Sequence, residues 1–121
     1  MEGMSLELTQ IVETIDQLLP QLKNFIGQFN QLVASSGINV VTDLGGNMSL
    51  DVPSSMPDDL AEHLGRKIGV IDRLITTRGQ EIDGLLHKSI EIENKLESSE
   101  FKSKILERVA EFQKLNKSYK H

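Results

Sequence analysis

Apolar residues recur every three or four positions through the first third of the chain. The main row is Leu8, Ile11, Ile15, Leu18, Leu22, Phe25, Phe29 and Leu32. A second row repeats every seven residues beside it and contains Val12, Leu19, Ile26 and Val33. This is the a/d pattern of a heptad repeat, with an apolar face too wide for a two-stranded coiled coil. It predicts a helix over residues 5–35 that belongs to a multi-helix bundle.

Three residues define this first predicted helix further. Ser5 is a suitable N-cap, and Gly37 can supply the left-handed residue that ends a helix. Pro20 lies on the outward side and removes one backbone hydrogen bond. The apolar spacing continues through Pro20, so we expect one bent helix.

The apolar period changes over residues 38–53. Ile38, Val40 and Thr42, and then Met48, Leu50 and Val52, alternate on either side of Leu44-Gly45-Gly46-Asn47. Alternation around a Gly-Gly turn is typical of a β-hairpin. An isolated hairpin is marginally stable in water, so an irregular loop is an equal alternative.

A second helix is predicted over residues 56–97. Ser55 can cap it, Pro57 suits its first turn, and its positions again follow strict four-three spacing. That row is Leu64, Ile68, Ile71, Ile75, Arg78, Ile82, Leu85, Ser89, Ile92 and Leu96. The polar members Arg78 and Ser89 either specify a partner or register, or Arg78 extends its charged end to water while its stem packs.

The apolar spacing breaks at Ser98-Ser99. A new series from Phe101 to Tyr119 predicts either a third helix over residues 99–118 or a continuation with a phase shift. The chain of 121 residues is therefore expected to be a single, mainly α domain. Its predicted architecture is an antiparallel helical hairpin or coiled-coil bundle with a C-terminal helix.

Composition indicates a small core and little chemistry. The chain has no Trp, one Tyr and four Phe, so we expect a protein partner to complete its apolar face. It has no Cys, its three His residues form no metal-ligand motif, and no catalytic or phosphate-binding motif is present. We therefore predict a protein that is not an enzyme and that uses no cofactor or metal.

Charge and hydropathy argue against nucleic acid and membrane as the partners of this chain. The net charge is −5, with six acidic residues and one basic residue in positions 1–56. A basic C-terminal segment is outweighed by this acidity, so nucleic acid is not the expected partner. No apolar run approaches the ~18 residues of a membrane span, and no signal peptide is recognised. We expect an intracellular protein, either cytoplasmic or nuclear.

The order of helix, hairpin and helix resembles that of prefoldin subunits. In that family a hairpin assembles the oligomer and the tips of the coiled coil hold unfolded clients. The resemblance rests on element order over much of the chain and implies a chaperone subunit as one alternative.

The leading hypothesis is a helical scaffold subunit of a larger assembly, which packs its heptad face against partner helices. A hetero-oligomer is favoured, and a self-associating oligomerisation domain is the other alternative. The residues expected at the core and partner interface are Ile15, Leu22, Phe25, Phe29, Ile68, Ile71, Ile75, Arg78, Ile82 and Leu85.

Overall fold

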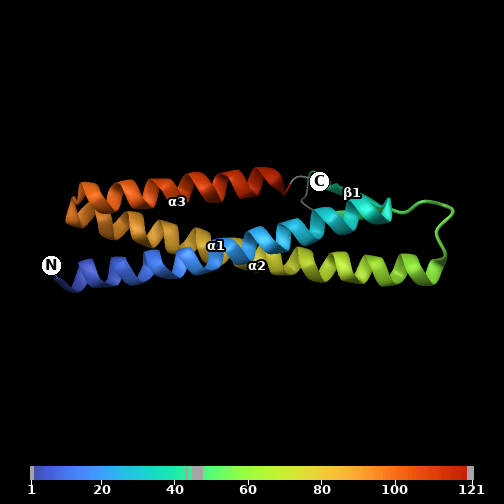
Figure 1. Cartoon of the computed structure of the whole chain (residues 1–121), viewed down its shortest axis with the longest axis horizontal. Coiled ribbons are helices and arrows are strands. Elements are labelled where there is room, and N and C mark those ends of the chain that lie inside the picture. Colours follow the sequence, from blue (N-terminus) through green and yellow to red (C-terminus); the bar gives the residue numbers. More distant parts are fainter. Residues whose placement is uncertain (1, 43, 45–47, 120–121) are drawn as a thin grey trace.

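Three helices dominate the computed structural model, which describes residues 2–42, 44 and 48–119. They are α1 (Glu2–Ser36), α2 (Asp58–Leu96) and α3 (Ser99–Ser118). The helices pack against one another, and a small two-stranded sheet lies in the connector between α1 and α2 (Figure 1). The predicted mainly helical bundle is therefore confirmed.

The first two helices run antiparallel and cross near their middles (Figure 1). Helix α1 is continuous through Pro20, as the unbroken apolar spacing predicts. It begins at Glu2, so the prediction that Ser5 caps its N-terminus is wrong. Instead, the Ser5 carbonyl lies within the helix and accepts a hydrogen bond of 2.9 Å from the hydroxyl of Thr9.

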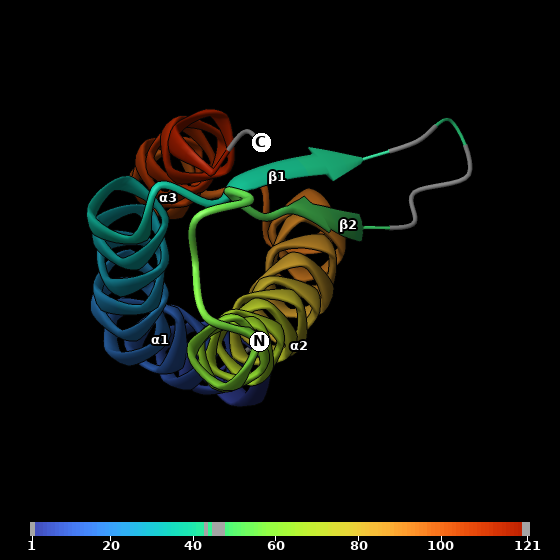
Figure 2. The ribbon, with the colours of Figure 1, turned by 90° about the vertical axis from the view of Figure 1, so that its right-hand side faces the viewer.

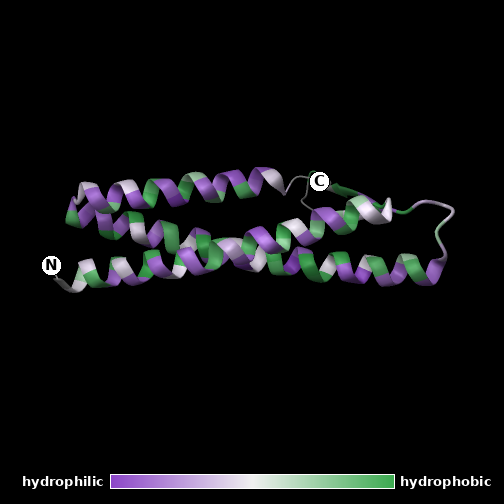
Figure 3. Cartoon of the chain, viewed as in Figure 1, coloured by the Kyte–Doolittle hydropathy of each residue, from purple (hydrophilic) through white to green (hydrophobic). Residues whose placement is uncertain are grey.

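The core follows the central row of the α1 apolar face. Leu8, Ile15, Leu22 and Phe29, spaced seven apart, are at most 2% exposed. They pack with buried α2 residues spaced three, four or seven apart, namely Ile68, Ile71, Ile75, Ile82, Leu86, Ser89 and Ile92. Apolar and polar segments alternate along all three helices in Figure 3, as expected when each helix turns one face to its neighbours.

Helix α3 folds back and covers one side of the α1–α2 pair (Figure 2). Its buried residues are Ile105, Phe112 and Leu115. On its C-terminal side, the ring of Tyr119 meets Phe29 of α1 edge-on, with ring centroids 4.8 Å apart. The core of the bundle is thus completed on this side by the chain itself.

The connection between α2 and α3 takes only two residues. Glu97 has a left-handed backbone (φ 53°), and its N–H donates a hydrogen bond of 2.7 Å to the carbonyl of Glu93. Ser98 is extended, and α3 begins at Ser99 with the chain direction reversed (Figure 1). Of the two alternatives for this region, the separate third helix is therefore correct.

The connector between α1 and α2 contains the β-hairpin and not the alternative irregular loop. Strand β1 (Asn39–Thr42) pairs antiparallel with β2 (Met48–Asp51), with Val40 opposite Leu50. The predicted turn residues 45–47 lie outside the described part of the chain. Gly37 ends α1 with φ +75°, as expected.

The hairpin projects from one end of the bundle (Figure 2). Its inner side packs on α2, where a Cβ added at Gly65 would lie 3.4 Å from the Leu50 side chain. At the start of α2, Pro57 occupies the N-cap position and makes no side-chain capping bond, so the prediction that Ser55 caps this helix is wrong.

Candidate interaction surface

The two apolar rows that flank the core of α1 have different surroundings. Val12, Leu19 and Ile26 are buried. Leu18, Phe25 and Leu32 are only partly buried against the core. At 100° per residue, these three lie about half a turn around α1 from Asp16 and Asn30, which bond to α3. They therefore line the side of the α1–α2 pair that α3 leaves uncovered.

Helix α2 supplies the other wall of this uncovered side. Val70 is 53% exposed, Leu74 is 36% exposed, and Leu85 is partly buried. Near the hairpin end, a hollow of about 260 Å³ opens between the helices and is lined by Gln28, Gln31, Leu32, Ser35, Lys67 and Ile71. We call this surface the open groove and define it by Leu18, Phe25 and Leu32 of α1 and Val70, Leu74 and Leu85 of α2.

The α1 edge of the open groove carries no charged residue between residues 10 and 35. Two rows with seven-residue spacing follow this edge, and all their members are exposed: Gln10, Gln17, Asn24 and Gln31, and Thr14, Gln21, Gln28 and Ser35. Exposed helix faces normally carry charged residues, whereas the centres of protein interfaces are depleted of them. We did not predict this surface from the sequence, although the seven-residue repeat of amides was a readable signal.

Seven of the ten residues predicted for the core and partner interface lie in the core of the chain. Ile15, Leu22, Phe29, Ile68, Ile71, Ile75 and Ile82 are all buried in contacts among the three helices. Phe25, Arg78 and Leu85 remain at the uncovered side. On α2 the buried residue of this turn is Leu86, whereas the other buried apolar residues of the helix are members of the predicted row.

The two polar residues of the predicted α2 row have separate environments. Arg78 donates hydrogen bonds to Gln21 of α1 at 3.0 Å and to Glu81 at 2.9 Å, and its side chain is 29% exposed. Ser89 is fully buried, and its hydroxyl donates to the carbonyl of Leu86 at 2.7 Å. Both residues therefore have partners inside the chain.

Helix α3 is held by a second set of polar contacts. Arg108 donates two hydrogen bonds, of 2.8 and 2.9 Å, to the carboxylate of Asp16. The hydrogen bond with Asp16 raises the pKa of Arg108, and desolvation opposes it. The hydroxyl of Tyr119 donates a hydrogen bond to Asp72. Burial is the main cause that raises the pKa of Tyr119 above its usual value, and this hydrogen bond is the second cause.

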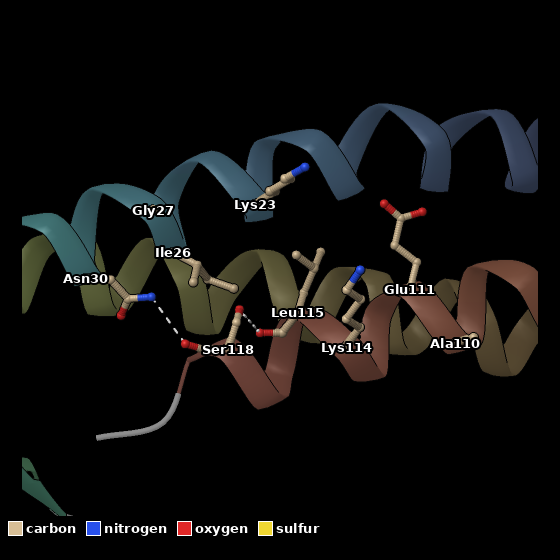
Figure 4. Close-up of a pocket in the computed structure, with 9 residues that line it drawn as sticks. All are labelled: Lys23, Ile26, Gly27, Asn30, Ala110, Glu111, Lys114, Leu115 and Ser118. Atoms are coloured by element: carbon tan, nitrogen blue, oxygen red, sulfur yellow. Dashed lines mark hydrogen bonds between the residues drawn. The ribbon is translucent and has the colours of Figure 1, made fainter.

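A second, larger hollow lies between α1 and α3. Its volume is about 570 Å³, and Figure 4 shows Glu111 extending from α3 toward α1 beside Lys114. The amide of Asn30 donates to the carbonyl of Ser118 at 3.2 Å and closes one end. A Cβ added at Gly27 would meet no atom within 4 Å, so missing side-chain volume on α1 contributes to this space.

Most of the described His, Asp and Glu residues lie on exposed helix faces. His87 lies 2.8 Å from the carbonyl of Asp83, and both residues are exposed on α2. Within residues 2–42, 44 and 48–119, no three His, Asp or Glu side chains form a group that could hold a metal ion. Among the same residues, no helix has the length and apolarity needed to cross a membrane.

Comparisons of the chain with protein-family models, with curated proteins and with solved structures gave no match.

Proposed function

We propose that this chain is a non-catalytic helical scaffold subunit that binds a partner helix in the open groove. The observation that carries this proposal is the asymmetry of the α1–α2 pair. On one side α3 covers the row of Val12, Leu19 and Ile26. On the other side the equivalent row of Leu18, Phe25 and Leu32 has no covering helix among the described elements.

A helix is the occupant that suits the shape and chemistry of this surface. From Leu18 to Leu32 the α1 wall is about 21 Å long at 1.5 Å per residue, which matches a partner helix of roughly 14 residues. Two antiparallel helices with heptad-spaced apolar walls accept a further helix by knobs-into-holes packing, as in a coiled-coil bundle. Burial of the apolar walls would supply the binding energy at ~25 cal/mol per Å² of surface removed from water.

Two matched leucine substitutions test the proposal. Leu74→Lys places a charge in the open groove, whereas Leu106→Lys places one on α3, where the leucine is 57% exposed and lies outside the groove. We expect proteins that co-purify with the tagged full chain from its native source to be lost with Leu74→Lys and retained with Leu106→Lys. Circular dichroism should show that both variants keep the helical content of the parent chain. Equal retention of partners by both variants would exclude the open groove as the binding surface.

A prefoldin-like chaperone subunit is the second candidate, because a hairpin does connect two long antiparallel helices. This role predicts that the chain suppresses the aggregation of an unfolded client at stoichiometric ratio. Failure to suppress aggregation of several unrelated clients would count against it. For either role we propose an intracellular location, cytoplasmic or nuclear, which the Cys-free composition favours.

A further inference from the structure

We infer that the open groove binds α1 of a second copy of this chain, in antiparallel orientation, and so forms a two-fold symmetric dimer. This inference rests on the proposed function and identifies the partner helix in the open groove as α1 of a second copy. Two observations support it: the uncharged α1 edge, and the charged residues near the two ends of the groove.

The uncharged edge of α1 is complementary to itself. A two-fold interface brings the same face of the two copies together, so a face with charges of one sign would bring like charges together. Gln and Asn side chains both donate and accept hydrogen bonds, so an amide face can bond to an identical face. The two α1 rows contain five Gln, one Asn, one Thr and one Ser, and no charged residue.

The charged residues nearest the groove differ between its two ends. Near the start of α1, Glu7 continues the row of Thr14 and Gln21, and its carboxylate lies 3.2 Å from Lys88. Near the hairpin end, the basic Lys67 lines the hollow beside Leu32 and Ser35. An antiparallel second copy brings its Glu7 to this basic end, whereas a parallel copy would bring Glu7 beside Glu7.

The register of this arrangement follows from the centre of the uncharged edge. A two-fold axis at Gln21 places Thr14 opposite Gln28 of the second copy, and Glu7 opposite Ser35. Ser35 lines the same hollow as Lys67, so Glu7 of one copy approaches Lys67 of the other. Within the part of the chain that the structure describes, Lys67 and Arg73 have no ion-pair partner, so both remain available to an acidic neighbour.

The charges nearest the axis also fit a symmetric contact. Arg78 binds Gln21 and is neutralised by Glu81 at 2.9 Å. A two-fold axis at Gln21 brings two such ion pairs together, so each guanidinium can meet a carboxylate of the other copy.

The absence of Cys from the chain allows the register to be measured by single cysteine substitutions. A disulfide requires Cα atoms within about 7 Å. Under mild oxidation of the full chain, we expect Gln21→Cys to form covalent dimers with itself. Thr14→Cys and Gln28→Cys should each stay monomeric alone, because two copies of either position lie about 21 Å apart along the helix. A mixture of these two variants should form the crosslinked dimer.

Lys23→Cys is the matched control, since Lys23 is exposed on α1 but lines the hollow toward α3. It should not crosslink. Self-crosslinking of Thr14→Cys and Gln28→Cys would overturn the antiparallel arrangement, and absence of crosslinks in the mixture would overturn the register.

Light scattering and a charge exchange provide measurements without cysteine. At micromolar concentration the parent chain should have twice the monomer mass of 13.5 kDa. Glu7→Lys and Lys67→Glu should each weaken dimerisation by up to about fivefold, as for a rim ion pair. The double variant should regain affinity, although it does not restore the 3.2 Å contact of Glu7 with Lys88 within one copy. No recovery would overturn the proposed pairing of the ends.

These results separate the dimer from the broader proposal. A monomeric chain whose co-purifying proteins are lost with Leu74→Lys would overturn the dimer and leave binding of another helix intact. A dimer that Leu74→Lys leaves unchanged, with co-purifying proteins also unchanged, would overturn both.

Discussion

Two phenylalanines on α1 should respond to truncation in opposite ways. Phe29 is 2% exposed in the core and touches Tyr119, whereas Phe25 lies four residues earlier on the open groove and is only partly buried. Phe29→Ala and Phe25→Ala remove the same atoms from the same helix. Their comparison therefore isolates the effect of location.

The expected cost of Phe29→Ala is about 4 kcal/mol, within the ~3–5 kcal/mol found for aromatic truncation in a core. Part of this, about 1 kcal/mol, is the lost edge-to-face contact with Tyr119. For a 121-residue chain, a loss of about 4 kcal/mol corresponds to a fall in Tm of roughly 16 °C. Phe25→Ala should cost only about 1–2 kcal/mol, because the ring already contacts solvent and leaves a smaller cavity.

Binding should show the reverse order. Phe25→Ala should weaken dimerisation on the order of a hundredfold, since a two-fold interface loses both aromatic rings at its centre. Phe29→Ala should keep the parent dimerisation constant below its own Tm. Urea unfolding followed at 222 nm, repeated at two protein concentrations, measures stability and light scattering measures association. Equal loss of stability in the two variants, or loss of association in Phe29→Ala alone, would refute this division of the α1 face.

Three further predictions concern the helix ends and α3. Glu97→Gly should raise the free energy of unfolding by about 1 kcal/mol, because glycine adopts the observed φ of 53° without the penalty of a side chain; an unchanged urea midpoint would contradict this. Asp16→Asn should lower it by about 0.5–1 kcal/mol through loss of the ion pair with Arg108, and by less in high salt, since Asp16 is 47% exposed. The raised pKa of Tyr119 favours its neutral form in the folded state, so its stabilisation is complete below the unfolded pKa of about 10 and is lost as pH rises beyond it. Tyr119→Phe should therefore show a shallower loss of stability between neutral and alkaline pH than the parent chain, and equal slopes would exclude this residue as the cause.

The apolar face of α1 could be predicted from spacing, but its division between core and groove could not. A face three positions wide contains two acceptable heptad rows, which share Leu8, Ile15, Leu22 and Phe29. The buried row pairs these residues with Val12, Leu19 and Ile26, because α3 lies on that side. The choice depends on where a helix distant in sequence docks, which local periodicity does not contain.

The same reason explains why Leu86 and not Leu85 is buried on α2, and where Arg78 lies. Helix α2 packs against both α1 and α3, so its buried face includes Leu86, and Arg78 lies at the edge where Gln21 accepts its hydrogen bond. The hairpin could be anticipated from alternation, yet its stability depends on contacts such as Leu50 beside Gly65, which only the folded chain provides. At the helix ends, the extra turn before Ser5 illustrates that caps are local preferences that packing can override.

The position of the single Tyr gives the chain an internal optical probe. With no Trp in the sequence, ultraviolet fluorescence comes mainly from Tyr119, and a phenol bonded to a carboxylate emits weakly. When α3 separates from Phe29 and Asp72, the emission should rise, while far-ultraviolet circular dichroism follows all three helices together. Two spectra of the same unlabelled sample can therefore reveal whether α3 detaches before the α1–α2 pair unfolds, and so whether the bundle is one cooperative unit or two.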